Sequence, residues 1–291
     1  MDDRSTVKPQ AAPSAERVHV DQVIFTSVRS VTAEGYRIIA ASGGVKPEEK
    51  AEIIRRAPSH GSLCEAEPQA RALSAYPLNG GRYCVALSQY AGVEHTARGG
   101  LRVHTHIVVL DQQDYPAFGC NAVRVYAALA DAVGGKPVLD PPRQLDRLEL
   151  PITRPKTQAA TDVACAEDAV RFGSEPQGEG QPQAAEVLPI LLGVLEGDEQ
   201  IVTGASDRFD LLEQVLIALP LTARRSLAVS VGLNYSPSRR LGLCFVPRDN
   251  GETKRATRGR KVRMLDASAH RSRQSTSEQS RAYQQAGSAQ Q

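Results

Sequence analysis

The apolar run from Leu101 to Leu110 constrains the fold of this chain more than any other stretch, because it is the longest clear strand signal and carries two histidines. Side chains alternate between the two faces of a strand, so His104 and His106 are expected on one face and Thr105 on the other. Two imidazoles on one face can be ligands of a single metal ion, or they can pack and hydrogen-bond inside a small sheet. The residues alone leave both interpretations open.

Further strand and helix signals surround this run and define the fold class. Periodicity predicts strands at residues 18–30, 36–41, 70–78, 82–89 and 101–110, and helices at 46–56 and 121–133. Asn79-Gly80-Gly81 is a tight-turn signal, since Asn and Gly tolerate positive φ. This order is typical of an α+β fold with one mostly antiparallel sheet and helices packed on a face.

A second, smaller α+β unit is expected after a proline-rich stretch. It contains predicted helices at 184–195 and 207–219, a strand at 199–203, and a hairpin formed by 226–233 and 240–246. The expected organisation is a disordered leader (1–17), an N-terminal α+β domain (18–135), a linker (136–183), the smaller α+β domain (184–247) and a basic disordered tail (248–291).

The net charge of +2 hides an asymmetry between the body and the tail. From Arg248 onward there are ten Lys or Arg residues and four acidic ones, so the tail carries +6 and the preceding chain −4. A basic tail can bind an anionic polymer. The tail has a single aromatic residue, Tyr283, so base stacking is not supported and nucleic-acid binding is not expected.

The cysteines and the hydropathy pattern indicate a cytoplasmic protein. The five cysteines form no Cys-x-x-Cys pair, which is typical of free thiols in a reducing compartment. The N-terminus has no secretory signal, and no apolar run approaches the roughly 18 residues that indicate a membrane span.

Motifs of known enzymes are absent from the sequence. The glycine-rich stretches fit neither a Walker loop nor Gly-x-Gly-x-x-Gly, and no Gly-x-Ser-x-Gly occurs. No cofactor and no catalytic residue is therefore expected. The alternative is a metal-dependent hydrolase in which His104 and His106 bind the ion together with Glu94 or Asp111.

Two polar clusters are candidates for contacts with a partner. Glu94, His95 and Arg98 lie in the glycine-flanked loop 92–100, which can bind an anion or a partner's carboxylate, or can be a solvated connection. Arg224-Arg225 and Arg239-Arg240 can likewise bind phosphate or an acidic partner, or be solvated ends of a helix and a turn.

Several of these segments together resemble the bacterial GTPase-associated protein family. The N-terminal domain of that family is similar to Val20–Ser27, Gly80–Val85, Tyr90–Gly100 and His104–Leu110, where Gly92, Arg98, Gly100 and His104 match its pattern. Its middle domain is similar to the segment with Leu219-Pro220, the two arginine pairs and Ser236. The resemblance covers roughly residues 18–133 and 184–247.

The resemblance implies a non-enzymatic interaction protein that binds or regulates a GTPase, in a multi-component bacterial conflict or signalling system. With the absence of a complete catalytic set, it favours an adaptor over the metal-dependent hydrolase. The expected partner surface consists of Glu94, His95, Arg98, His104 and His106.

Overall fold

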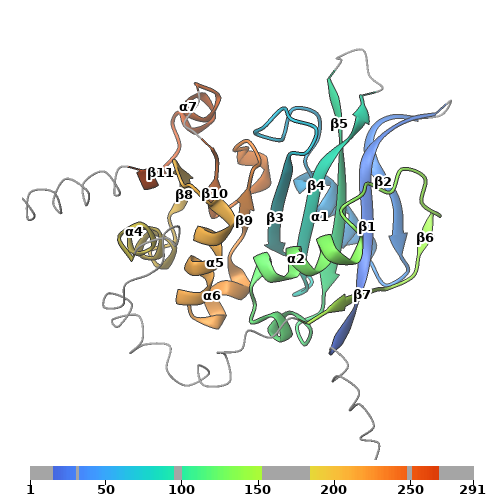
Figure 1. The fold of residues 1–291 in the computed structure, drawn as a ribbon, viewed down its shortest axis with the longest axis horizontal. Coiled ribbons are helices and arrows are strands. Elements are labelled where there is room, and N and C mark those ends of the chain that lie inside the picture. Colours follow the sequence, from blue (N-terminus) through green and yellow to red (C-terminus); the bar gives the residue numbers. More distant parts are fainter. Residues whose placement is uncertain (1–15, 31–32, 95–99, 153–183, 248–250, 269–291) are drawn as a thin grey trace, which may run out of the picture.

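The computed structural model describes residues 16–30, 33–94, 100–152, 184–247 and 251–268, in which eleven strands form one mixed sheet (Figure 1). The strand order is β11-β8-β10-β9-β3-β4-β5-β1-β2-β6, and β7 pairs with β1 beside this path. Most strand pairs in the first half are antiparallel, and the pairs among β8 to β11 are parallel. The expected α+β class is confirmed.

The antiparallel half follows the predicted order of elements. Its elements are β1 (Arg17–Ser30), β2 (Ala33–Ser42), α1 (Pro47–Arg56), β3 (Arg71–Pro77), β4 (Tyr83–Val93), β5 (Leu101–Leu110) and α2 (Ala122–Ala132). A 3-10 turn, η1 (Tyr115–Phe118), precedes α2. The side chain of Asn121 accepts hydrogen bonds from the amides of Val123 and Arg124 and so caps the start of α2.

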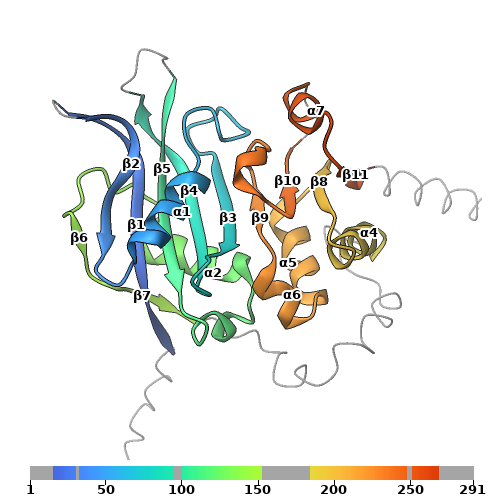
Figure 2. The same cartoon turned by 180° about the vertical axis from the view of Figure 1, so that it is seen from behind.

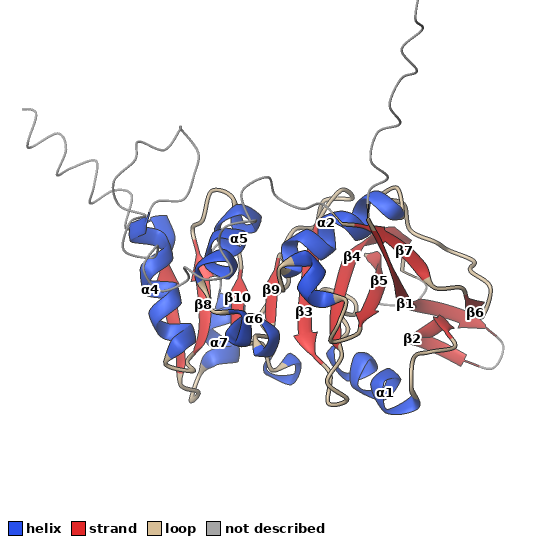
Figure 3. Cartoon of the chain, turned by 90° about the horizontal axis from the view of Figure 1, so that it is seen from below, coloured by secondary structure: helices blue, strands red, loops and turns tan. Residues whose placement is uncertain are grey.

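Helices α1 and α2 lie on opposite sides of this half of the sheet (Figure 3). The alternation of strand residues explains which side chains each helix covers. Val108 and Leu110 of β5 belong to the core that contains Leu129 of α2. Ile107 and Val109 belong to the core that contains Ile53 of α1. The even-numbered side chains of β5, including its two histidines, therefore lie on the α2 side.

The second half of the sheet is largely parallel and has its own helices. Its elements are α4 (Ala184–Leu195), β8 (Glu199–Thr203), α5 (Arg208–Ala218), α6 (Leu221–Ser226), β9 (Val229–Val231), η3 (Pro237–Arg239), β10 (Leu243–Phe245), α7 (Gly251–Thr257) and β11 (Val262–Asp266). The expected hairpin is wrong, because β9 and β10 pair in parallel. Residues 232–242 return the chain to the starting end of β9 through η3 and through Arg240, which adopts a left-handed conformation.

Strand β9 joins the two halves into one sheet. It pairs antiparallel with β3, with Val229 opposite Ala75 and Val231 opposite Leu73. One apolar core continues across this junction and contains residues of both α2 and α5. The two expected units therefore share a sheet and a core.

The structure also differs from the expected linker and tail. Within the stretch expected as linker, β6 (Gln144–Leu145) pairs with β2, and β7 (Leu148–Pro151) pairs with β1 (Figure 2). Within the stretch expected as disordered, α7 and β11 are formed, and β11 adds to the edge of the sheet beside β8. Arg263 and Lys261 pair there with Asp198, so acids of the smaller unit offset part of the basic charge.

The described cysteines are free thiols. Burial raises the pKa of Cys84 to about 12 and that of Cys244 to about 11, so both are protonated at neutral pH. Among the helices within the described ranges, none has the length and apolar character needed to cross a membrane.

Candidate functional site

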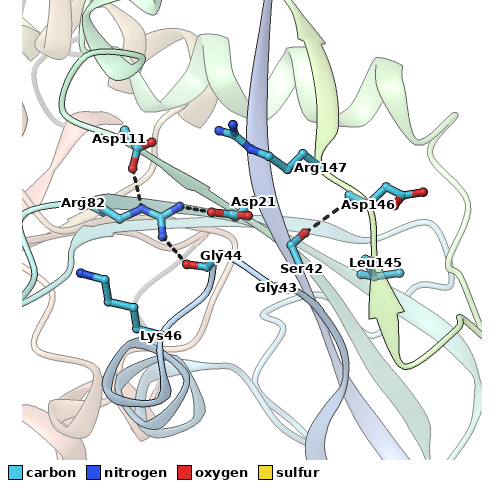
Figure 4. Close-up of a pocket in the computed structure, with 10 residues that line it drawn as sticks. All are labelled: Asp21, Ser42, Gly43, Gly44, Lys46, Arg82, Asp111, Leu145, Asp146 and Arg147. Carbon is cyan, nitrogen blue, oxygen red and sulfur yellow. Dashed lines mark hydrogen bonds and ion pairs between the residues drawn. The ribbon is translucent and has the colours of Figure 1, made fainter.

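A pocket of about 530 Å³ opens where β2 and β5 end and β4 begins (Figure 4). The loop that connects β2 to α1 forms one wall, and the segment around β6 forms another. Its lining residues are Asp21, Ser42, Gly43, Gly44, Lys46, Arg82, Asp111, Leu145, Asp146 and Arg147. They come from five separate parts of the chain, and sequence reasoning did not identify this pocket.

Arg82 lies at the centre of the pocket, and its side chain is only 10% exposed. Its Nη2 donates to Asp21 Oδ2 at 2.5 Å and to the carbonyl of Val109 at 3.2 Å. Its Nη1 donates to the carbonyl of Gly44 at 3.1 Å and to Glu49 Oε2 at 3.2 Å. Strands β1 and β5, the loop after β2 and helix α1 thus all meet at one guanidinium.

Asp111 completes the set of acceptors around Arg82, with its Oδ1 2.8 Å from Nε. Of the five N–H donors of the guanidinium, those on Nη1 and Nη2 donate to four acceptors, whereas Nε forms an ion pair with Asp111 but no hydrogen bond. The Nη donors of Arg82 are therefore committed to the protein's own acceptors. Its role is to hold together three carboxylates that would otherwise repel each other.

The rim of the pocket carries both signs of charge. Lys46 and Arg147 are exposed on it, and so are Asp146 and, by half, Asp111. The hydroxyl of Ser42 donates to the backbone carbonyl of Asp146, so no base activates it as a nucleophile. The pocket is thus suited to contact charged side chains of another molecule, and its lining residues offer no nucleophile paired with a base.

The two histidines of β5 are buried on the α2 side of the sheet. His104 is fully buried, and His106 is 4% exposed. His104 Nε2 lies 3.0 Å from the carbonyl of Val138, and His106 Nε2 lies 2.8 Å from Gln22 Oε1. Because both partners are acceptors, each Nε2 carries the proton. Neither Nε2 is then a metal ligand, as the hydrolase alternative requires.

Burial controls the charge of both rings. It lowers the pKa of His104 to about 4, and the hydrogen bond to the Val138 carbonyl opposes this only in part. Burial, followed by the nearby His104, lowers the pKa of His106 to about 4. Both imidazoles are neutral at pH 7. The part of the chain that the structure describes holds no group of three or more His, Cys, Asp or Glu side chains able to bind a metal.

Glu94 lies on the other side of the sheet from the histidines. Ser27, on the same face of β1 as Phe25, donates to its Oε1 at 2.6 Å, and the hydroxyl of Tyr36 donates to its Oε2 at 2.6 Å. Burial and the Glu94 carboxylate together raise the pKa of Tyr36 well above its ordinary value. The sheet thus separates Glu94 from His104 and His106, which were expected to form one surface.

His95 and Arg98 lie outside the described residues. The base of their loop is described on both sides: Gly92 and Gly100 have φ of 82° and 89°, and the amide of Glu94 donates to the carbonyl of Gly100. Arg102 fixes the same base by donating from Nε and Nη2 to the carbonyl of Ala91.

The arginine pairs of the second half divide into buried and exposed members. Arg224 is buried and donates to the carbonyls of Leu219, Gly119 and Ile217, which closes the end of α5. Arg239 is also buried and bonds to Ser62 and to the carbonyl of Asn234. Arg225 and Arg240 are exposed. One arginine of each pair therefore supports the fold, and the other is exposed.

The comparison with protein-family models matches part of the chain. Residues 19–149 match the family model described as GTPase-associated protein 1, N-terminal domain type 2. This confirms the resemblance for the antiparallel half, and the match does not extend to residues 184–247, where similarity to a middle domain was expected. No curated protein and no solved structure matches the chain. All ten lining residues of the pocket lie inside the matched stretch.

Proposed function

We propose, from the premise that residues 19–149 are a GTPase-associated protein 1 N-terminal domain, that this chain binds and regulates a GTPase without catalysing a reaction itself. The family match carries the proposal, because it covers the antiparallel half of the sheet from β1 into β7. We place this activity in the cytoplasm, in a bacterial conflict or signalling system.

The chemistry of the described side chains supports a binding role. At the polar centre around Arg82, the Nη donors are occupied by the protein's own acceptors. The paired histidines are neutral and use their Nε2 protons for internal hydrogen bonds. Groups committed in this way stabilise a scaffold and do not transfer protons to a substrate.

The proposed contact surface is the loop 92–100 at the end of β4 and β5. Its base is fixed, because the hydroxyls of Ser27 and Tyr36 donate hydrogen bonds to the Glu94 carboxylate. Val93, next to Glu94, is 70% exposed and offers an apolar contact. A fixed base lowers the ordering cost of residues 92–94 and 100 on binding. In this proposal His95 and Arg98 contact the partner, while Glu94 anchors the loop. The buried His104 and His106 act only through the fold.

The experiment that tests the proposal starts from affinity capture of the tagged full-length chain in its native lysate, with mass spectrometry of the bound proteins. We expect a GTPase to be enriched. The purified GTPase is then titrated with the variant Val93→Ser and with the double variant His95→Ala, Arg98→Ala. Each should weaken binding at least tenfold, which corresponds to about 1.4 kcal/mol.

Lys46→Ala is the matched control, since Lys46 is exposed on the pocket rim at the opposite end of β4. Its affinity should equal that of the unchanged chain. If Lys46→Ala weakens binding and the loop variants do not, the mixed-charge rim of the pocket is the contact surface. If no GTPase is enriched, the proposed function is wrong.

A further inference from the structure

The outer side of helix α4 is apolar, like the side that packs against the sheet. From Val187 to Leu195 the helix contains no polar residue. Ile190 points into the core shared with α5 and is 1% exposed. The exposed leucines on the other side are Leu188 (56%), Leu192 (48%) and Leu195 (61%), and their spacing of four and three residues places them on one stripe. A helix that is apolar on all sides is normally buried, so this stripe is expected to be covered.

The stripe lies at one end of the sheet, and a long segment of the chain ends beside it. Figure 3 shows α4 at the end of the sheet opposite β6, and α4 contacts β8 and β11 there. Residues 153–183 connect Ile152, after β7, to Ala184, the first residue of α4. In the strand order, β1 (the partner of β7) and β11 are seven positions apart, which is about 34 Å. Roughly ten extended residues cover that distance, so most of residues 153–183 are not needed for the connection.

The sequence of residues 161–172, which lie outside the described residues, predicts an amphipathic helix. At about 100° per residue, one half of this helix carries the apolar side chains of Val163, Cys165, Ala166, Ala169, Val170 and Phe172. The charged side chains of Glu167, Asp168 and Arg171 fall on the other half. Asp162 precedes the pattern as an N-cap residue, and Gly173 follows it as a C-terminal stop.

The connection from this predicted helix to α4 is short enough to keep the two together. Residues 173–183 consist only of Gly, Ser, Glu, Pro and Gln, and when extended they reach up to about 36 Å. The leucine stripe extends over only about 10 Å of α4, so the predicted helix can fold back along it. A tether of this length gives an effective concentration on the order of 1 mM. A second copy lacks such a tether and would need about 20–30 residues on each side for a stable interface, far more than three leucines.

We propose that residues 161–172 form a helix whose apolar half packs on Leu188, Leu192 and Leu195 of α4. Packing in this way removes both apolar surfaces from water and leaves the charged half of the helix exposed. It also closes the end of the sheet opposite β6. This packing does not require a GTPase or any other partner of the chain.

Limited digestion of the full chain with trypsin tests this packing, because residues 153–183 contain the cleavage sites Lys156 and Arg171. Lys156 precedes the proposed helix, and Arg171 lies inside it. Proteases cleave a folded segment only when it opens transiently, so docking should slow cleavage after Arg171. We expect Leu188→Asp, Leu192→Asp to accelerate cleavage after Arg171 at least tenfold and to leave the rate after Lys156 unchanged, as followed by mass spectrometry.

Two further variants separate docking from damage to the fold. Val163→Asp, Val170→Asp changes the segment itself and should accelerate cleavage after Arg171 by the same factor. Leu221→Asp is the matched control, since Leu221 is 39% exposed on α6 and lies outside the stripe, and it should leave both rates unchanged. Should the α4 variant not fold, Leu195→Asp, at the most exposed position of the stripe, takes its place.

The proposal is overturned if cleavage after Arg171 has the same rate in the unchanged chain and in both double variants. It is also overturned if only one of the double variants accelerates cleavage, because the two surfaces then do not pack on each other. Sedimentation velocity identifies the remaining alternative. A dimer that dissociates in Leu188→Asp, Leu192→Asp, with Arg171 cleaved rapidly in the dimer, overturns the proposal and assigns the stripe to a second copy.

Discussion

Nη2 of Arg82 lies 2.5 Å from the carboxylate of Asp21, a residue 61 positions earlier in the chain. The contact joins the start of β4 to β1, and Glu49 from α1 and Asp111 from the end of β5 bind the same guanidinium. Three acidic side chains thus depend on one basic side chain. This arrangement fixes the loop before α1 and with it the shape of the pocket.

Removal of the Arg82 guanidinium should strongly destabilise the fold. Arg82→Met leaves Asp21 and Glu49 buried without their cation, and breaking a buried ion pair from one side costs about 3–5 kcal/mol. Urea unfolding should therefore give a lower free energy of unfolding by that amount. Arg147→Met, an exposed arginine of the same pocket, should stay within about 0.5 kcal/mol of the unchanged chain. A loss below about 1 kcal/mol in Arg82→Met would contradict the central role of this residue.

Replacing Gly44 in the pocket wall by alanine should destabilise the protein more than replacing its neighbour Gly43. A Cβ at Gly44 would overlap the carboxylate of Asp21, whereas the nearest atom to a Cβ at Gly43 is 3.7 Å away on Gln144. Gly44→Ala should therefore cost about 1–3 kcal/mol, because Asp21 has to move away from Arg82. Gly43→Ala should be nearly neutral. Thermal unfolding of both variants checks this, and equal midpoints would show that Asp21 is not fixed at this position.

Substitutions of the two adjacent arginines of α6 should lower the free energy of unfolding by different amounts. Arg224→Met removes hydrogen bonds to three backbone carbonyls around the end of α5, so it should destabilise the protein by about 2 kcal/mol or more. Arg225→Met changes an exposed side chain and should cost less than about 0.5 kcal/mol. Urea unfolding distinguishes the two, and equal stabilities would mean that the buried guanidinium does not support α5.

The histidine pair should make stability fall as the pH decreases. The folded-state pKa of about 4 is below the ordinary 6.5, so between these values the unfolded chain binds more protons than the folded one. Stability is therefore complete above pH 6.5 and is lost as the pH falls towards 4, by up to about 3 kcal/mol for each histidine. Urea unfolding at pH 7.5 and 5.0 measures this fall. The variant His104→Gln, His106→Gln should show a smaller fall, and an identical fall would exclude the histidines as its source.

Local patterns in the sequence predicted the antiparallel half well. The alternation in Leu101–Leu110 placed His104 and His106 on one face, and the structure has them there. The turn at Asn79–Gly81 and the helix beginning at Pro47 were likewise predicted from residues close to them in sequence. These elements depend on neighbouring residues, which a single sequence contains.

The contacts between distant segments were not predictable in the same way. The partners of Arg82 lie up to 61 residues away, and nothing in Gly80-Gly81-Arg82 indicates them. The parallel pairing of β9 with β10 and the addition of β11 depend on where the chain returns to the sheet. The burial of Arg224 and Arg239 depends on carbonyls and hydroxyls of remote loops, so their charge alone suggested a surface role.

The most direct test of the central claim is calorimetric titration of the full chain into the captured GTPase, loaded either with GDP or with a non-hydrolysable GTP analogue. The account predicts saturable binding in at least one nucleotide state, a changed rate of GTP hydrolysis by the GTPase, and no hydrolysis by the chain alone. Absence of binding in both nucleotide states, or hydrolysis by the chain itself, would contradict a non-enzymatic regulator of a GTPase.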